Sequence, residues 1–293
     1  MKLSELGEDR LLARLLPLLP IGSGVITAAG DDCAIVQPPD RGNLLVLKSD
    51  CLVEKVHFEL SADPARVGWK AMMRPLSDFA AVSAVPQFAL ITLIVSGKTS
   101  LTWVENLYRG LRRAASRFKV SIVGGETSDT QGPVAISVSV SGSVEKRRLV
   151  TRHGGKIGDV LFVTGRLGGA LHGRHLRFIP RIEESRWLTG KFSVHAMMDL
   201  SDGLGTDLPR LARASGVGFA IDKNALPLAS GSTVQSAISD GEDYELLFAV
   251  SRHGQRHLEK SWHKRFPKLA LTCIGNLTSK IKHQTLPSGY VHF

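Results

Sequence analysis

The alternation of apolar and polar positions predicts two successive groups of strands and helices. Residues 134–144 show it most clearly, because valine and isoleucine alternate with serine as in a half-exposed antiparallel strand. Residues 101–118 repeat apolar positions at helical spacing and carry arginines on the other face. In the first half we expect strands at 33–36, 43–48, 88–95, 120–123 and 134–144, and helices at 3–16, 65–85 and 101–118.

A change of composition divides the chain. Residues 145–158 are basic and rich in glycine, which is typical of a connection between domains. We therefore expect one domain at 1–147 and a second at 148–293. In the second domain, apolar runs predict strands at 159–164, 217–222, 244–250 and 269–274, and periodicity predicts a helix at 204–214.

Composition and charge narrow the class of protein. The net charge of +10 can attract nucleic acid or a small phosphorylated substrate, but no nucleic-acid-binding motif accompanies it. The three cysteines form no C-x-x-C pair, so reduced thiols in the cytoplasm are expected and a zinc site is not. The apolar run at 88–95 is too short to span a bilayer. We expect a cytoplasmic protein that binds neither membrane nor nucleic acid.

Acidic residues stand close together around the second predicted strand. Asp31 and Asp32 are adjacent, and the apolar run that follows ends on Lys48, Ser49 and Asp50. A fold that brings these carboxylates together needs a cation to offset their repulsion, and hard oxygen ligands suit Mg²⁺. The alternative is a solvated acidic turn followed by an ordinary strand. The residues alone leave both open.

Further acids occupy similar positions along the chain. Asp78 lies within an apolar helical surface, where a carboxylate is costly unless it is paired or binds a metal; a helix cap after a break at Pro75 is the alternative. Glu126 follows two glycines, and Asp199 and Asp202 precede a helix. The chain contains no P-loop, dinucleotide fingerprint, G-x-S-x-G or H-E-x-x-H motif. An acidic centre in a basic protein therefore indicates metal ions that hold a polyphosphate.

Seven segments, taken in order, resemble one family. They are GDDCAIV, SDCLVEKVHF, GWKAMMRPLSDFAAVSAVP, IVGGET, LVTRHGGKIGDVLFVTGRLGGA, MMDLSDGLGTDLPRLARASGVG and GEDYELLF. Together they are similar to the motifs of the thiamine-monophosphate kinases, within the aminoimidazole-ribonucleotide synthetase superfamily. The resemblance implies an α+β fold: an N-terminal α/β-sandwich domain that contributes strands to the β-barrel of a homodimer, followed by a C-terminal α/β domain.

The resemblance also implies a role for single residues. Asp50, Asp78 and Asp199 would be catalytic, and Lys48 would contribute its backbone carbonyl rather than its side chain. The Mg²⁺ ligands would be Asp32, Lys48, Ser49, Asp50, Asp78, Glu126, Asp199 and Asp202. Gly125, Glu126, Arg152 and Ser201 would contact ATP, and His57, Glu242 and Tyr290 would contact thiamine monophosphate.

The implied activity is transfer of the γ-phosphoryl of ATP to thiamine monophosphate, with Mg²⁺, to give thiamine diphosphate. Two positions depart from the family pattern: Glu126 replaces an aspartate, and Pro75 replaces an asparagine and is expected to bend the helix that carries Asp78. Other readings are another ATP-using enzyme of the superfamily and, because of Glu126, a non-catalytic protein that binds thiamine phosphates or nucleotides. A nucleic-acid-binding role rests on charge alone.

Overall fold

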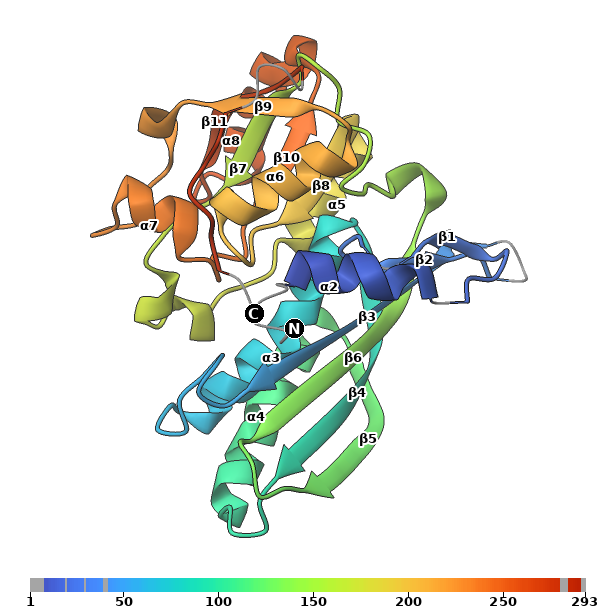
Figure 1. Cartoon of the computed structure of the whole chain (residues 1–293), viewed down its shortest axis with the longest axis vertical. Coiled ribbons are helices and arrows are strands. Elements are labelled where there is room, and N and C mark those ends of the chain that lie inside the picture. The colour runs from blue at the N-terminus through green and yellow to red at the C-terminus, as the bar shows by residue number, and fades with distance from the viewer. Residues whose placement is uncertain (1–7, 19, 29, 39–41, 280–283, 291–293) are drawn as a thin grey trace.

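A computed structural model describes residues 8–18, 20–28, 30–38, 42–279 and 284–290. Seven α-helices and two β-sheets form a mixed α/β fold in this part of the chain. The two sheets belong to successive halves of the sequence, and the long helix α3 (Pro64–Ala81) runs from the first half towards the second (Figure 1). None of the described helices is long and apolar enough to cross a lipid bilayer.

The first sheet has six strands in the order β1-β2-β3-β6-β4-β5. All neighbouring strands are antiparallel except β4 and β5, which run parallel and are joined by helix α4 (Leu101–Phe118). The strands are β1 (Val25–Thr27), β2 (Ala34–Val36), β3 (Leu44–Val53), β4 (Val85–Val95), β5 (Ser121–Asp129) and β6 (Ala135–Val144).

Among the described residues, helices cover only one face of this sheet. The inner face packs on α3 and α4 through buried side chains such as Ile91 and Val138. The serines predicted to alternate in residues 134–144 lie on the outer face, opposite the buried valines of β6. The outer face also carries exposed apolar side chains, among them Leu47, Phe88 and Leu90.

Three local predictions need correction. The strand expected at 43–48 continues to Val53, because β6 pairs with it over its whole length; Asp50 therefore lies within a strand rather than at its end. Likewise β5 continues through the two glycines and Glu126, which pair with β4. Helix α3 does not break at Pro75, so Asp78 is not the cap of a new helix. The helix expected at 3–16 is described only as α2 (Glu8–Leu15), because residues 1–7 lie outside the described residues.

The second sheet has five antiparallel strands in the order β8-β10-β7-β11-β9. Helices α6 and α7 pack on one face, and α5 and α8 pack on the other, so both faces are buried. The strands are β7 (Val160–Thr164), β8 (Val194–Asp199), β9 (Gly218–Ile221), β10 (Leu246–Val250) and β11 (Leu271–Thr278); the helices are α5 (Ile182–Lys191), α6 (Leu204–Ala214), α7 (Val234–Ser239) and α8 (Gln255–Arg265).

One end of the second sheet faces the first half of the chain. Asp199, the last residue of β8, pairs with Leu246 at the start of β10, and Thr164 at the end of β7 lies in the same row. Helix α3 packs against β8 and α5 here. Loops that leave this end therefore meet side chains of α3, and the candidate site forms where they meet.

Candidate active site

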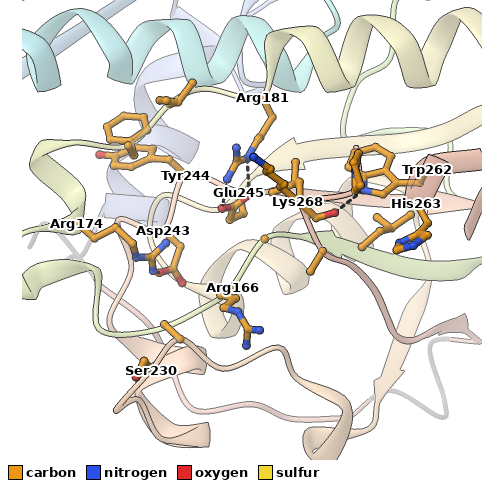
Figure 2. A pocket seen from close by; sticks show the side chains of 18 of the residues that line it. Arg166, Arg174, Arg181, Ser230, Asp243, Tyr244, Glu245, Trp262, His263 and Lys268 are labelled. Atoms are coloured by element: carbon orange, nitrogen blue, oxygen red, sulfur yellow. Dashed lines mark hydrogen bonds and ion pairs between the residues drawn. The ribbon is translucent and has the colours of Figure 1, made fainter. Parts of the chain in front are cut away.

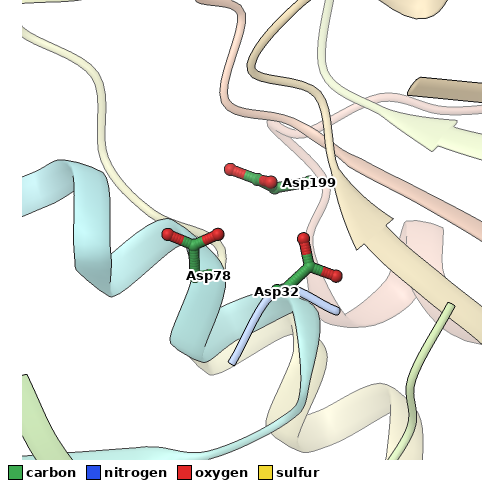
Figure 3. A group of neighbouring side chains, drawn as sticks. All are labelled: Asp32, Asp78 and Asp199. Carbon is green, nitrogen blue, oxygen red and sulfur yellow. The ribbon is translucent and has the colours of Figure 1, made fainter. Parts of the chain in front are cut away.

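Three aspartates from distant parts of the chain converge at this junction. Asp32 precedes β2, Asp78 belongs to α3, and Asp199 ends β8 (Figure 3). Each offers a carboxylate oxygen, and these oxygens lie within 4.8 Å of one another. All three residues are buried, with exposed fractions of 1%, 7% and 2%. So close a group of buried carboxylates repels itself strongly unless cations or protons compensate it.

Side-chain cations approach this cluster from its edges. Arg152 makes a bidentate pair with Asp32, with Nη2 at 2.7 Å from Oδ1 and Nε at 3.2 Å from Oδ2. Lys48 Nζ lies 3.0 Å from Asp78 Oδ2 and 3.8 Å from Asp50 Oδ1. Only the backbone carbonyl of Lys48 was expected at the metal site, whereas the structure brings its ammonium into the cluster as well. Asp199 accepts a hydrogen bond of 2.6 Å from the Ser77 hydroxyl.

The protonation of the cluster reflects incomplete compensation. Burial raises the pKa of Asp199 to about 7, and the charge of Asp32 adds to this effect. Burial also raises the pKa of Asp78 well above its ordinary value, against the attraction of Lys48 and with the repulsion of Asp50 and Asp199. Burial and the adjacent Asp32 raise the pKa of Asp31 to about 6. Burial and mutual repulsion thus disfavour the ionised forms of these carboxylates, and a bound divalent cation would offset both effects.

A cavity of about 530 Å³ opens beside the cluster. Its wall is formed by charged and polar side chains from both halves of the chain, among them Lys48, Asp78, Arg152, Ser201 and Asp202. Asp202 is paired with Arg210 of α6, and its backbone N–H donates to buried Asp207 at 3.0 Å. The structure thus brings five of the eleven predicted metal and nucleotide residues to the wall of one cavity. A volume of this size accommodates a small-molecule ligand.

A second charged group surrounds Glu242, one of the predicted substrate residues. Lys70 of α3 is fully buried, and its Nζ lies 2.8 and 2.6 Å from the two carboxylate oxygens of Glu242. The same ammonium donates to the carbonyl oxygen of His57 at 2.7 Å. His175 Nδ1 lies 2.6 Å from Glu242 Oε2. Burial opposes the charge of Glu242, but the His175 hydrogen bond and Lys70 outweigh it and lower its pKa to about 2.

Other predicted residues do not reach the cluster within this chain. The Ser49 side chain bonds Ser139 Oγ at 2.9 Å on the outer face of the first sheet, opposite its neighbours in β3. Gly125 and Glu126 lie on the exposed edge strand β5, three strands from β3, which is about 14 Å at the usual spacing. Tyr290 is 41% exposed, and its backbone N–H donates to the Asp202 carbonyl at 2.8 Å.

A larger cavity, of about 760 Å³, lies across the loop that precedes β10 (Figure 2). Its lining includes Asp243, Tyr244 and Glu245, but within the described residues it includes none of the predicted site residues. Arg174 Nη2 lies 2.5 Å from Asp243 Oδ1, and Arg181 makes a bidentate pair of 2.5 and 2.7 Å with Glu245. These pairs hold the loop of residues 240–245, which also carries Glu242. The ion pairs in the wall of this cavity therefore help to keep Glu242 in place.

Several residues of the site were not predicted from the sequence. Lys70 and Arg74 lie eight and four residues before Asp78, so the helical spacing could have placed all three on one face of α3. Ser77 could not be recognised in this way, because its contact with Asp199 spans 122 residues of sequence. His175 belongs to a short 3-10 turn, and no pattern in the sequence marks it.

Comparisons with known proteins agree with this geometry. The AIR synthase related protein N-terminal domain matches residues 30–144, and the C-terminal domain of the same group matches residues 179–254. The thiamine-monophosphate kinase of Rhodopirellula baltica is 35% identical over 321 aligned positions, which cover 100% of this chain and 97% of that protein. This chain belongs to the thiamine-monophosphate kinase family. It is therefore an enzyme of the phosphotransferase class.

Further members extend the comparison. The thiamine-monophosphate kinase of Aquifex aeolicus is 34% identical, over 94% of this chain and 93% of its own. The structure of AaThiL complexed with AMPPCP and TMP superposes with a TM-score of 0.85 at 33% identity, covering 100% of this chain and 99% of that one. The family's fold thus extends through both halves described above.

Proposed function

We propose that this enzyme transfers the γ-phosphoryl group of ATP to thiamine monophosphate and forms thiamine diphosphate, with Mg²⁺ as the metal. The observation that carries the proposal is the buried group of Asp32, Asp78 and Asp199 beside a cavity of about 530 Å³. The AaThiL complex with AMPPCP and TMP supports both substrates by similarity. In the transfer, an oxygen of the acceptor's phosphate forms a bond to the γ-phosphorus, and the bond to the β,γ-bridging oxygen breaks to release ADP.

The residues present fit magnesium. Carboxylate oxygens are its preferred protein ligands, and three of them lie within 4.8 Å of one another. Asp32, Asp78 and Asp199 would hold the ions, with Asp50 and Asp202 at the edge of the same region. Bound Mg²⁺ would neutralise the polyphosphate and stabilise the charge that develops on the transferring group. Lys48 and Arg152 already supply positive charge at the cluster's edge and would orient phosphate oxygens there.

Catalysis at the acceptor phosphate depends more on its correct position than on a strong general base. A phosphate oxygen is nucleophilic at neutral pH, so the chain has to align it with the γ-phosphorus and reduce repulsion between two anions. Glu242, fixed by Lys70 and His175, would anchor the cationic thiamine body near His57, and Tyr290 would offer an aromatic face. Arg152, Ser201, Gly125 and Glu126 are the proposed nucleotide residues.

We also propose a homodimer in which a second copy covers the outer face of the first sheet. Leu47, Phe88, Leu90 and Val123 are 40–59% exposed there and line a groove of about 410 Å³. Ser49 and Glu126 share this face, so closure into a barrel would place a partner beside both. Phe88→Glu is expected to convert the dimer to monomer in sedimentation analysis, because the charge would be buried at the interface.

The activity is tested by following thiamine diphosphate directly with ATP, Mg²⁺ and thiamine monophosphate. Wild-type protein should form product, and Asp78→Asn should reduce the rate by about a thousandfold because it weakens the metal cluster. Glu105→Gln on the exposed surface of α4 is the charge-matched control and should keep full activity. Calorimetric binding of thiamine monophosphate without product would favour a non-catalytic binding protein. Neither product nor binding would overturn the proposed substrate.

A further inference from the structure

Helix α3 presents a row of three charged side chains to the site. Lys70, Arg74 and Asp78 are spaced four residues apart, which places them on one face with a rise of about 6 Å between successive members. Lys70 binds Glu242 at one end of the row, and Asp78 belongs to the acid cluster at the other. Arg74 therefore lies along the helix between the proposed acceptor anchor and the proposed metal site.

Arg74 differs from its basic neighbours in lacking a carboxylate partner. Arg152 is paired with Asp32, and Lys48 with Asp78, but within the described residues Arg74 forms no ion pair. Its Nη1 donates to the Cys51 carbonyl oxygen at 3.0 Å, and its buried Nε has no hydrogen-bond partner there. A buried guanidinium donor left unsatisfied is costly, so this position favours a ligand that brings acceptor oxygens.

The surroundings define the chemistry of that ligand. Arg74 lines the cavity of about 530 Å³ together with Lys48, Asp78 and Arg152. The carboxylates that act on it come from both groups described above: Glu242 on one side, and Asp50 and Asp78 on the other. The planar fork of a guanidinium matches the oxygens of a phosphate and holds them bidentately.

We propose that Arg74 binds the phosphate of the acceptor substrate and holds it between Glu242 and the acid cluster. This inference rests on the proposed function. It assigns recognition of the thiamine body to Glu242 and recognition of its phosphate to Arg74. Arg74 lies about one helical turn from the proposed metal ligand Asp78. Lys70, which holds Glu242, shares helix α3 with Arg74 and Asp78, so the acceptor oxygen would be presented towards Asp78 in one position.

Thiamine and thiamine monophosphate differ only in the phosphate, so their relative affinities isolate the contact. Calorimetry with Mg²⁺ and without nucleotide should show wild-type protein binding thiamine monophosphate about tenfold or more tightly than thiamine. Arg74→Met removes the charge and the donors but keeps a long side chain. It should reduce this ratio to about two or less and leave the affinity for thiamine unchanged. Arg74→Lys, which keeps a point charge, should give an intermediate ratio.

Arg112→Met on the exposed face of α4 is the matched control and should keep the wild-type ratio. Thermal unfolding without ligand shows that each variant is folded. The inference is overturned if Arg74→Met keeps the wild-type ratio, or if it weakens thiamine as much as thiamine monophosphate. If wild-type protein does not bind thiamine monophosphate, the proposed function is overturned and this inference with it. If wild-type protein binds it and only the affinity ratio of Arg74→Met falls, the result supports the role of Arg74.

Discussion

Helix α3 contributes to two groups of charged side chains that balance charge in opposite ways. At Asp78, three buried carboxylates converge within 4.8 Å, and the cations Lys48 and Arg152 reach them only from the edge. Two turns earlier, at Lys70, a single carboxylate receives an ammonium and an imidazole at 2.6 Å each. The first group has three carboxylates for two cations, whereas in the second group the single carboxylate is fully paired.

The acid cluster could therefore bind a further cation, whereas the Glu242 carboxylate already has its cationic partner in Lys70. In the acid cluster, burial and mutual repulsion raise the pKa of Asp199 to about 7. In the Lys70 group, the His175 imidazole and the Lys70 ammonium lower the pKa of Glu242 to about 2, although burial opposes this. With Mg²⁺ bound as proposed, the acid cluster would gain its compensating charge from the ion, whereas Glu242 is already held by Lys70 and His175. Variants that remove one member should affect the two groups in opposite directions.

The largest expected effect on stability comes from the group of Lys70, Glu242 and His175. Lys70→Met leaves the Glu242 carboxylate buried without its ammonium partner, and should lower the free energy of unfolding by about 3–5 kcal/mol. Urea unfolding of the metal-free protein measures this loss. Adding Glu242→Gln to Lys70→Met should restore most of it, because the stranded charge is then removed. Equal losses in the single and double variants would contradict the pairing.

The acid cluster should respond with the opposite sign. Asp199→Asn removes one repelling charge and keeps a partner for the Ser77 hydroxyl, so the metal-free protein should gain about 1 kcal/mol or more. The gain should disappear with saturating Mg²⁺ and ATP, because the variant binds the metal less well. A loss of stability in the metal-free variant would show that the cluster is already compensated internally.

A smaller effect follows from pH. The pKa of Glu242 lies near 2 in the folded protein and near 4.5 ordinarily, so its charge contributes stability that is complete above pH 4.5 and is lost as pH falls towards 2. The difference in unfolding free energy between wild-type protein and Glu242→Gln should therefore be constant from pH 7 to about 5 and shrink below it. Chemical unfolding at closely spaced pH values measures this difference, and a difference independent of pH would contradict the shift.

Much of the site could be predicted from the sequence because its acids stand in distinctive local patterns. Asp32, Asp78 and Asp199 each belong to a recognisable motif, and the structure brings them together. The side of the sheet on which the Ser49 side chain lies could also have been deduced, because neighbouring side chains in a strand point to opposite sides. The length of β3 could not, since it depends on pairing with β6, about ninety residues later in the chain.

The pairings that give the site its charge balance were not predictable from local patterns. Arg152 meets Asp32 across 120 residues, and Lys70 meets Glu242 across 172. Such contacts are fixed by how the two sheets pack around α3. The spacing of Lys70, Arg74 and Asp78 on α3 was visible in the sequence, but its meaning depended on what each side chain faces.

The central claim is that the three buried aspartates form the metal site for phosphoryl transfer. Anomalous diffraction from crystals grown with Mn²⁺ and the non-hydrolysable nucleotide AMPPCP tests it most directly, since Mn²⁺ takes the same oxygen ligands as Mg²⁺. We predict an anomalous peak bonded to oxygens of Asp32, Asp78 and Asp199 and to the nucleotide phosphates. Bound nucleotide with no peak at these carboxylates, and with Lys48 still paired to Asp78, would contradict the account.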